Sequence, residues 1–293
     1  MPPSPFVPAP LAGRVFRGSR AVERGLLTRK QLRSSAWRRL RHDVYADARL
    51  AVDHGLAVAA AALVLPAGGV FAGRSAAWLY GIAQAGAEDP VDVLVPLRTS
   101  WWAPPGLSVH VGADGTDDVT VLGRRPVTVP ARTGVDIARW YAAPAAVPLI
   151  DAMLAVRLVS PAVLRTQLTL ASGQGKTRAS ATLALCDHRA ESPPESVLRV
   201  LLAMAGLPDA VPQYEVRHAG RFVARVDLAW PAAKVAVEYD GAWHGAPGQL
   251  GRDRRRLNAL IAAGWTVIHV TATDMHDLSA VVGQVRATLE LAA

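Results

Sequence analysis

The sequence contains only one cysteine, Cys186, in 293 residues. A single thiol cannot form an intramolecular disulfide, and it excludes zinc sites that are built from several cysteines. Chains without disulfides are typical of reducing compartments, so we expect a cytoplasmic protein. No charged and then apolar leader opens the sequence, and we expect the proline-rich residues 1–12 to form a flexible tail.

Long apolar runs are also few. The stretch from Gly55 to Gly73 lacks charged residues, but Pro66, Gly68 and Gly69 interrupt it. It is rich in alanine, which gains little free energy on transfer to lipid. We therefore expect a buried helix followed by a turn, and no membrane partner.

Lysine is scarce too, with residues only at positions 30, 176 and 234, so arginine carries most of the positive charge. The formal net charge is +8, which suits a polyanionic partner. An arginine-rich composition also arises from GC-rich coding, so the charge alone does not identify DNA. With 51% hydrophobic residues the chain can bury full cores, and its length predicts two or three α/β (α+β) domains.

The block at residues 13–48 is the most basic part of the chain. Between Arg14 and Arg41 stand ten basic residues and one acidic residue, Glu23. A helix is predicted from Gly18 to Arg24 and a second from Thr28, a plausible N-cap, to Arg33. The basic run at 37–41 then leads into β-prone residues.

Within this block, the segments Gly25–Ser34 and Trp37–Tyr45 resemble the small winged-helix segment of AbiEi-type antitoxin proteins. That segment is taken to bind DNA in the family, so the resemblance implies a DNA partner; it leaves a toxin or other protein partner unidentified. The alternative is a solvated basic face on an ordinary helical subdomain. The side chains expected to face phosphates are Arg29, Lys30, Arg33, Arg38, Arg39 and Arg41.

Residues 49–190 predict a mixed α/β connector domain without a catalytic cluster. Gly175-Lys176-Thr177 resembles the end of a phosphate-binding loop, but Leu170 stands where that loop needs glycine. We interpret Ala171–Ser180 as a flexible linker. Helices are expected near 52–65, 75–82, 134–141 and 145–158, and strands near 91–96, 107–111 and 126–129.

Residues 191–293 predict a mixed sheet flanked by helices. A helix begins at Ser192, where Glu195 completes a capping box, and a strand–helix–strand unit near the end implies a parallel crossover. Strands are predicted at 214–217, 221–230, 235–240 and 265–271. The helix at 252–263 is predicted to bury Leu257, Leu260 and Ile261.

Two acidic residues meet in the predicted hairpin. A turn centred on Ala232 and Ala233 places Asp227 opposite Glu238. Facing residues have Cβ atoms about 5 Å apart, so two carboxylates repel unless a cation lies between them. The other face of these strands then consists of Val226, Leu228 and Val237.

The set Glu195, Asp227, Glu238-Tyr-Asp240-Gly, His244, Asp253-x-x-Arg256 and Gly264-Trp-x-Val resembles the Vsr-related branch of the PD-(D/E)XK, or restriction-endonuclease-like, superfamily. The resemblance implies phosphodiester hydrolysis with Mg²⁺ (or Mn²⁺), held by Asp227 and Glu238. Glu195 would be a helper carboxylate, and His244 would lie near the cut phosphate. Asp240 occupies the position where these enzymes usually have lysine.

Basic residues flank this set. Arg252, Arg254 and Arg255 would draw phosphate toward the metal, whereas Arg256 is expected to pair with Asp253 on the helix surface. Two functions follow. The first is a DNA-directed, metal-dependent endonuclease; the alternative is an antitoxin-like or regulatory DNA-binding protein that keeps an inactive nuclease-like scaffold.

Overall fold

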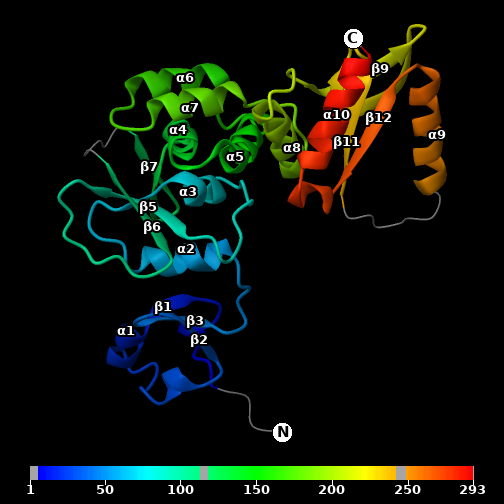
Figure 1. The fold of residues 1–293 in the computed structure, drawn as a ribbon. Helices are drawn as coiled ribbons and strands as arrows, with labels where there is room; N and C mark the ends of the chain where they lie inside the picture. The colour runs from blue at the N-terminus through cyan, green and yellow to red at the C-terminus, as the bar shows by residue number, and fades with distance from the viewer. Residues whose placement is uncertain (1–5, 113–117, 242–248, 293) are drawn as a thin grey trace. The chain divides into compact units, whose positions relative to one another are not determined.

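A computed structural model describes residues 6–112, 118–241 and 249–292, without the side chains of 249, 250, 252 and 253 (Figure 1). The chain divides into two compact units, Met1–Ile137 and Ala138–Ala293. Both units contain helices and strands, and the strands form three separate sheets, so the predicted α+β class is confirmed. The predicted boundaries at residues 12, 48 and 190 describe a finer division and stay predictions. Among the described residues, no helix is long and apolar enough to cross a membrane.

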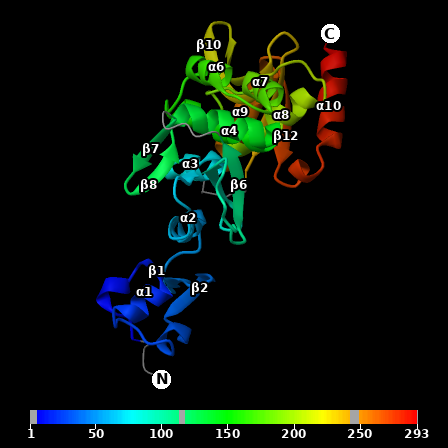
Figure 2. The same cartoon turned by 90° about the vertical axis from the view of Figure 1, so that its left-hand side faces the viewer.

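The first unit opens with a small three-stranded antiparallel sheet of order β1-β3-β2 (Figure 2). Phe16 and Trp37 meet edge to face at its centre, with ring centroids 5.0 Å apart. The predicted first helix is confirmed, and Gly25 ends it with φ +67°. Its elements are η1 (Ala9–Leu11), β1 (Val15–Arg17), α1 (Gly18–Glu23), η2 (Gln31–Arg33), β2 (Trp37–Arg41) and β3 (Val44–Asp47).

One expectation for this segment was wrong. The second helix is only the single 3-10 turn η2, because Thr28 and Gln31 bond each other and close the chain into a turn: Thr28 N donates to Gln31 Oε1 at 2.7 Å, and Gln31 N to Thr28 Oγ1 at 3.2 Å. The basic run is strand β2 itself, since Trp37 is buried and the strand pairs with β3.

The rest of the first unit is a mixed five-stranded sheet of order β6-β5-β4-β8-β7. Val91, Val93 and Phe71 pack on its inner face against helix α2. The predicted helices and strands of this region are found close to their expected positions. They are α2 (His54–Ala62), β4 (Val70–Phe71), α3 (Gly73–Leu79), β5 (Val91–Pro96), β6 (Leu107–Gly112), β7 (Val119–Leu122), β8 (Arg125–Thr128) and α4 (Pro130–Trp140), whose end lies in the second unit.

Three helices begin the second unit: α5 (Ala143–Ala155), α6 (Pro161–Leu170) and α7 (Lys176–Ala184). The predicted flexible linker at Ala171–Ser180 was therefore wrong from Lys176 onward. Helix α7 forms because Ala179 and Thr182 bury one of its faces, and Gly175, with φ +88°, supplies the turn before it.

A four-stranded sheet of order β12-β11-β10-β9 completes the second unit, and β11 and β12 are parallel as predicted. Helices α8 and α10 cover one face of this sheet, and α9 covers the other (Figure 1). The elements are α8 (Pro193–Met204), β9 (Val211–His218), β10 (Arg221–Trp230), β11 (Val235–Asp240), α9 (Gln249–Ala262), β12 (Thr266–Thr271), η3 (Asp274–His276) and α10 (Ser279–Leu291).

The predicted hairpin register is confirmed where the strands pair, from Trp230 opposite Val235 to Leu228 opposite Val237. The predicted alternation was wrong on one side. Leu228 and Val237 pack in one core cluster, but Val226 packs in the other, with Leu260 of α9. Gln213, on the neighbouring strand β9, has a φ of +51° between Pro212 and Tyr214, which pair with Leu228 and Val226.

The buried side of helix α9 also differs from the prediction. Leu260 is fully buried, but Ile261 is 58% exposed and Leu257 is half-buried. Ala263, three residues after Leu260, joins the core instead. Ile261 points away because successive helix positions are rotated by about 100°.

Candidate functional site

The three carboxylates singled out in the C-terminal sequence approach one another at the β10–β11 hairpin and the start of helix α8. Gln213 links two of them. Its Nε2 donates to Glu195 Oε2 at 2.9 Å and lies 3.4 Å from Asp227 Oδ1. The structure therefore brings together residues from α8, β9 and β10, with Glu238 next along on β11.

Asp227 is half-buried, and the carboxylates of Glu195 and Glu238 lie near it. Its Oδ2 accepts the backbone N–H of Tyr239 at 2.9 Å, one step beyond the registered pairs of the hairpin. Burial is the main cause that raises the pKa of Asp227 to about 6; the charges of Glu195 and Glu238 also raise this pKa, whereas the hydrogen bonds from Tyr239 and Gln213 lower it. The ionised form of Asp227 is therefore disfavoured in the folded chain.

Glu238 is buried, with 5% of its surface exposed, and its charge is balanced by Arg256. Arg256 Nη2 lies 2.5 Å from Glu238 Oε1, and Nη1 lies 2.7 Å from Oε2. Arg256 Nη2 also donates to the carbonyl oxygen of Arg225 at 2.6 Å. Both carboxylate oxygens of Glu238 are therefore bonded to one guanidinium. The expected partner, Asp253, has a side chain outside the described residues, so that pair stays a prediction.

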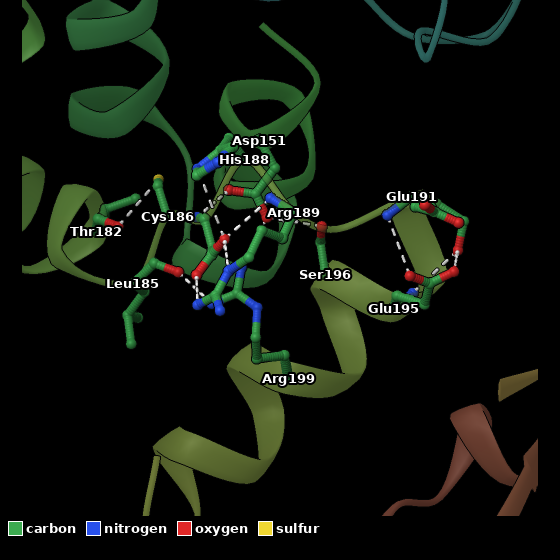
Figure 3. Close-up of polar contacts among 12 residues, drawn as sticks. Asp151, Thr182, Leu185, Cys186, His188, Arg189, Glu191, Glu195, Ser196 and Arg199 are labelled. Carbon is green, nitrogen blue, oxygen red and sulfur yellow. Dashed lines mark hydrogen bonds and ion pairs between the residues drawn. The ribbon is translucent and has the colours of Figure 1, made fainter. Parts of the chain in front are cut away.

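Glu195 closes the first turn of helix α8 (Figure 3). Ser192 Oγ donates to Glu195 Oε1 at 2.7 Å, and the Glu195 N–H lies 3.4 Å from the same hydroxyl. The return bond goes to the N–H of Glu191 at 3.1 Å, not to that of Ser192 as predicted. The Glu195 carboxylate therefore accepts hydrogen bonds both at the N-terminal end of helix α8 and from Gln213.

Asp240, at the position of the usual lysine, bonds a histidine that the sequence did not single out. His269 Nδ1 lies 3.0 Å from Asp240 Oδ2, and both residues are exposed. His269 is registered beside Glu238 on the parallel strand β12. The predicted His244 and the side chain of Arg252 lie outside the described residues, whereas Arg254 and Arg255 are exposed.

The donor set suits a hard divalent cation, because Asp227, Glu238 and Glu195 offer carboxylate oxygens. The arrangement as it stands is not a formed metal site. Within the described part of the chain, no three histidine, cysteine or acidic side chains are grouped so as to hold an ion. Glu238 gives both oxygens to Arg256.

The basic N-terminal side chains fall into two classes. Arg38 and Arg41 form the first class, because their guanidinium groups bond backbone carbonyl oxygens of the chain itself. Arg38 donates to Ala48 and Leu50, and Arg41 donates to Pro105. Both were expected to face phosphates, and that role stays a prediction. The exposed basic side chains of the predicted set are Arg29, Lys30, Arg33 and Arg39.

The first unit also contains a serine, a histidine and an aspartate in contact, which sequence reasoning missed. His54 Nε2 lies 2.9 Å from Ser75 Oγ, and that oxygen accepts the N–H of Asp92 at 2.9 Å. Burial lowers the pKa of His54, which is therefore neutral. All three residues are fully buried, so no substrate reaches the hydroxyl and we assign them a structural role.

A cavity of about 290 Å³ lies among helices α5, α6 and α7, lined by apolar residues such as Leu154, Leu164 and Leu183 together with Cys186. Burial raises the pKa of the Cys186 thiol, so the protonated thiol is favoured there over the reactive thiolate. None of the residues that line this cavity is one of the three carboxylates.

Comparison with known proteins favours one of the two predicted functions. Residues 61–185 match the family described as AbiEi antitoxin C-terminal domain. The match covers less than half of the chain. It starts after the segment whose winged-helix resemblance implied DNA binding, so that resemblance stays a prediction. The AbiEi-matching segment is instead the region whose sequence predicted only a connector.

Two relatives come from Mycobacterium tuberculosis, the uncharacterized proteins MT2308 of strain CDC 1551 / Oshkosh and Rv2248 of strain ATCC 25618 / H37Rv. Each is 33% identical over 174 residues, which cover 58% of this chain and 63% of the relative. The chain thus spans less than two thirds of these relatives.

Two solved structures are distantly similar. The RV2827C protein from Mycobacterium tuberculosis is 18% identical with a TM-score of 0.41, covering 71% of this chain and 82% of that chain. The catalytic domain of the homing endonuclease I-Bth0305I is 20% identical with a TM-score of 0.28, covering 34% of this chain and 95% of that chain. TM-scores this low do not establish a shared fold.

Proposed function

We propose that this chain is an antitoxin-type, DNA-binding regulatory protein whose C-terminal domain keeps a nuclease-like scaffold without cutting DNA. The match of residues 61–185 to an antitoxin domain carries the proposal. The antitoxin description also implies a toxin as protein partner, which no residue of this chain identifies.

The N-terminal subdomain supplies the DNA contact in this proposal. Four exposed basic side chains, those of Arg29, Lys30, Arg33 and Arg39, stand on and beside a strand-and-turn segment whose core is well packed. Neutralising phosphates with such side chains releases counterions, so binding should weaken steeply as salt rises.

The C-terminal domain supports the inactive reading through two residues. Asp240 stands where catalytic lysine is usual and bonds His269, so it brings no positive charge to an attacking water. Arg256 occupies both oxygens of Glu238, one of the two expected metal ligands.

A second function, metal-dependent phosphodiester hydrolysis, is favoured by one observation. The pKa of Asp227 is raised by burial and by two neighbouring carboxylates, an arrangement that a structural role does not require. A magnesium ion would polarise the phosphodiester and activate water there. Asp227 and Glu238 would hold it, and Gln213 would keep Asp227 and Glu195 oriented.

One experiment separates the two functions. Purified full-length protein is mixed with supercoiled plasmid in Mg²⁺ or Mn²⁺, and both mobility shift and nicking are followed. We expect a shift without nicking in the wild type. Nicking that Asp227→Asn abolishes would replace the regulatory proposal with the nuclease; nicking that survives in Asp227→Asn would indicate a contaminant.

A further inference from the structure

Glu238 and Arg256 form a closed pair at the centre of the carboxylate site. Two parallel N–H···O bonds of 2.5 and 2.7 Å join them, which is the bidentate geometry that holds a carboxylate most firmly. Glu238 is buried, whereas the side chain of Arg256 is 39% exposed, so solvent reaches only one partner of the pair. Arg256 is further held by the carbonyl oxygen of Arg225 at 2.6 Å.

A divalent cation at this site would need an oxygen of Glu238. Mg²⁺ and Mn²⁺ bind oxygen ligands at short range, and a guanidinium on the same carboxylate repels them. Asp227 is less fully engaged than Glu238. The contact from Gln213 Nε2 to Asp227 Oδ1 is long, at 3.4 Å, and Asp227 Oδ2 accepts one backbone N–H. The other two carboxylates of the site, Asp227 and Glu195, are linked by Gln213.

We propose that Arg256 acts as a built-in cation that occupies Glu238 and keeps a latent divalent-metal site closed. The inference rests on the proposed inactive scaffold and gives it a specific cause. Arg256 lies on helix α9, whereas both carboxylates lie on the hairpin, so the pair also ties the helix to the sheet. The site opens when Arg256 leaves at least one oxygen of Glu238.

The test removes the guanidinium and measures metal binding without reference to activity. Full-length wild type, Arg256→Gln and Arg255→Gln are titrated with Mn²⁺, and free Mn²⁺ is followed by its electron paramagnetic resonance signal. Arg255 is the matched control, because it is an exposed arginine on the same helix. Circular dichroism checks that each variant is folded.

We expect Arg256→Gln to bind Mn²⁺ about tenfold more tightly than wild type or better, because a unit positive charge a few Å from the ion is gone. Arg255→Gln should match wild type. Adding Asp227→Asn to Arg256→Gln should abolish the gain. A wild type that binds no Mn²⁺ while Arg256→Gln does would support the inference equally.

Three results would overturn it: equal or weaker binding by Arg256→Gln, no binding by any variant, or a gain that survives Asp227→Asn. If Arg256→Gln does not fold, Arg256→Lys replaces it, since lysine keeps the charge but cannot bond both oxygens; it should bind Mn²⁺ more tightly than wild type, and unchanged or weaker binding would contradict the inference. Plasmid nicking by the wild type would refute the inactive scaffold, while the Mn²⁺ titration still decides the role of Arg256.

Discussion

Arg199 Nη2 lies 2.7 Å from Asp151 Oδ2 in the interior of the second unit, and this ion pair joins helix α8 to helix α5 (Figure 3). Ser196 Oγ donates to the same oxygen at 2.7 Å, and the N–H of Asp187 donates to the other at 2.7 Å. Arg199 also bonds the carbonyl oxygen of Leu185. Helix α5 lies within the AbiEi-matching segment, and helix α8 begins after the end of that segment, so the pair connects the two parts within one unit.

Breaking this pair should destabilise the chain strongly. Asp151→Ala leaves the largely buried Arg199 without its carboxylate, and an uncompensated buried charge costs about 3–5 kcal/mol of unfolding free energy. Urea denaturation of the two proteins measures the loss. The double variant Asp151→Leu with Arg199→Met should lose clearly less; a double variant as unstable as Asp151→Ala would contradict the charge explanation.

The same aspartate predicts how stability depends on pH. The pKa of Asp151 is raised from 3.8, the ordinary value for aspartate, to about 6. Burial raises this pKa by more than the charge of Arg199 and the hydrogen bonds lower it. Between these values the folded chain binds a proton that the unfolded chain lacks, so this group adds stability as pH falls from above 6 to below 3.8. Wild type should gain on the order of 3 kcal/mol relative to Asp151→Asn over that range. A stability difference that is flat in pH, or that shrinks as pH falls, would refute this assignment.

Much of the C-terminal fold could be predicted from local sequence. The pair Ala232–Ala233 between two β-prone runs gave the correct hairpin register, and Gly264 marked the end of helix α9, where it has φ +81°. These features depend on a few neighbouring residues, whose conformational preferences act without the rest of the chain.

The contacts of the site depended on tertiary structure and were missed. Gln213 bridges Glu195 and Asp227 from strand β9, where its φ is +51°, and neither its place between them nor this φ has a local sequence signal. Arg256 has Asp253 three residues before it, but the fold brings Glu238, eighteen residues away, within reach of its guanidinium. When an arginine has an acidic residue one helix turn away, the sequence favours that local pair. It contains no signal that an acidic residue on a distant strand will bind the arginine instead.

Two aspartates with opposite pKa shifts should respond oppositely to the same substitution. Asp227→Asn should leave the metal-free chain as stable as wild type or more so, because its pKa is raised and its ionised form is disfavoured. The Asn oxygen still accepts the N–H of Tyr239. Asp47→Asn should instead cost about 1–3 kcal/mol, because Arg49 and the N–H of Gly13 hold the pKa of Asp47 low by bonding its charged form.

Thermal unfolding at pH 7.5, with the two variants beside wild type, checks this contrast. If Asp227→Asn lowers the melting temperature as much as Asp47→Asn does, Asp227 is a structural hydrogen-bonding residue and the carboxylate site is misassigned.

The central claim, that DNA binds through the N-terminal subdomain, is tested most directly by two variants of equal charge. The first variant replaces four residues with glutamine: Arg29, Lys30, Arg33 and Arg39. The second variant replaces four other exposed residues with glutamine: Arg98, Arg124, Arg165 and Arg178. Fluorescence anisotropy of a labelled duplex gives Kd at several salt concentrations. The first variant should lose about tenfold in affinity or more, with a salt slope smaller by about 3–4, and the second should bind like wild type. Equal losses in both variants, or no loss in the first, would contradict the account.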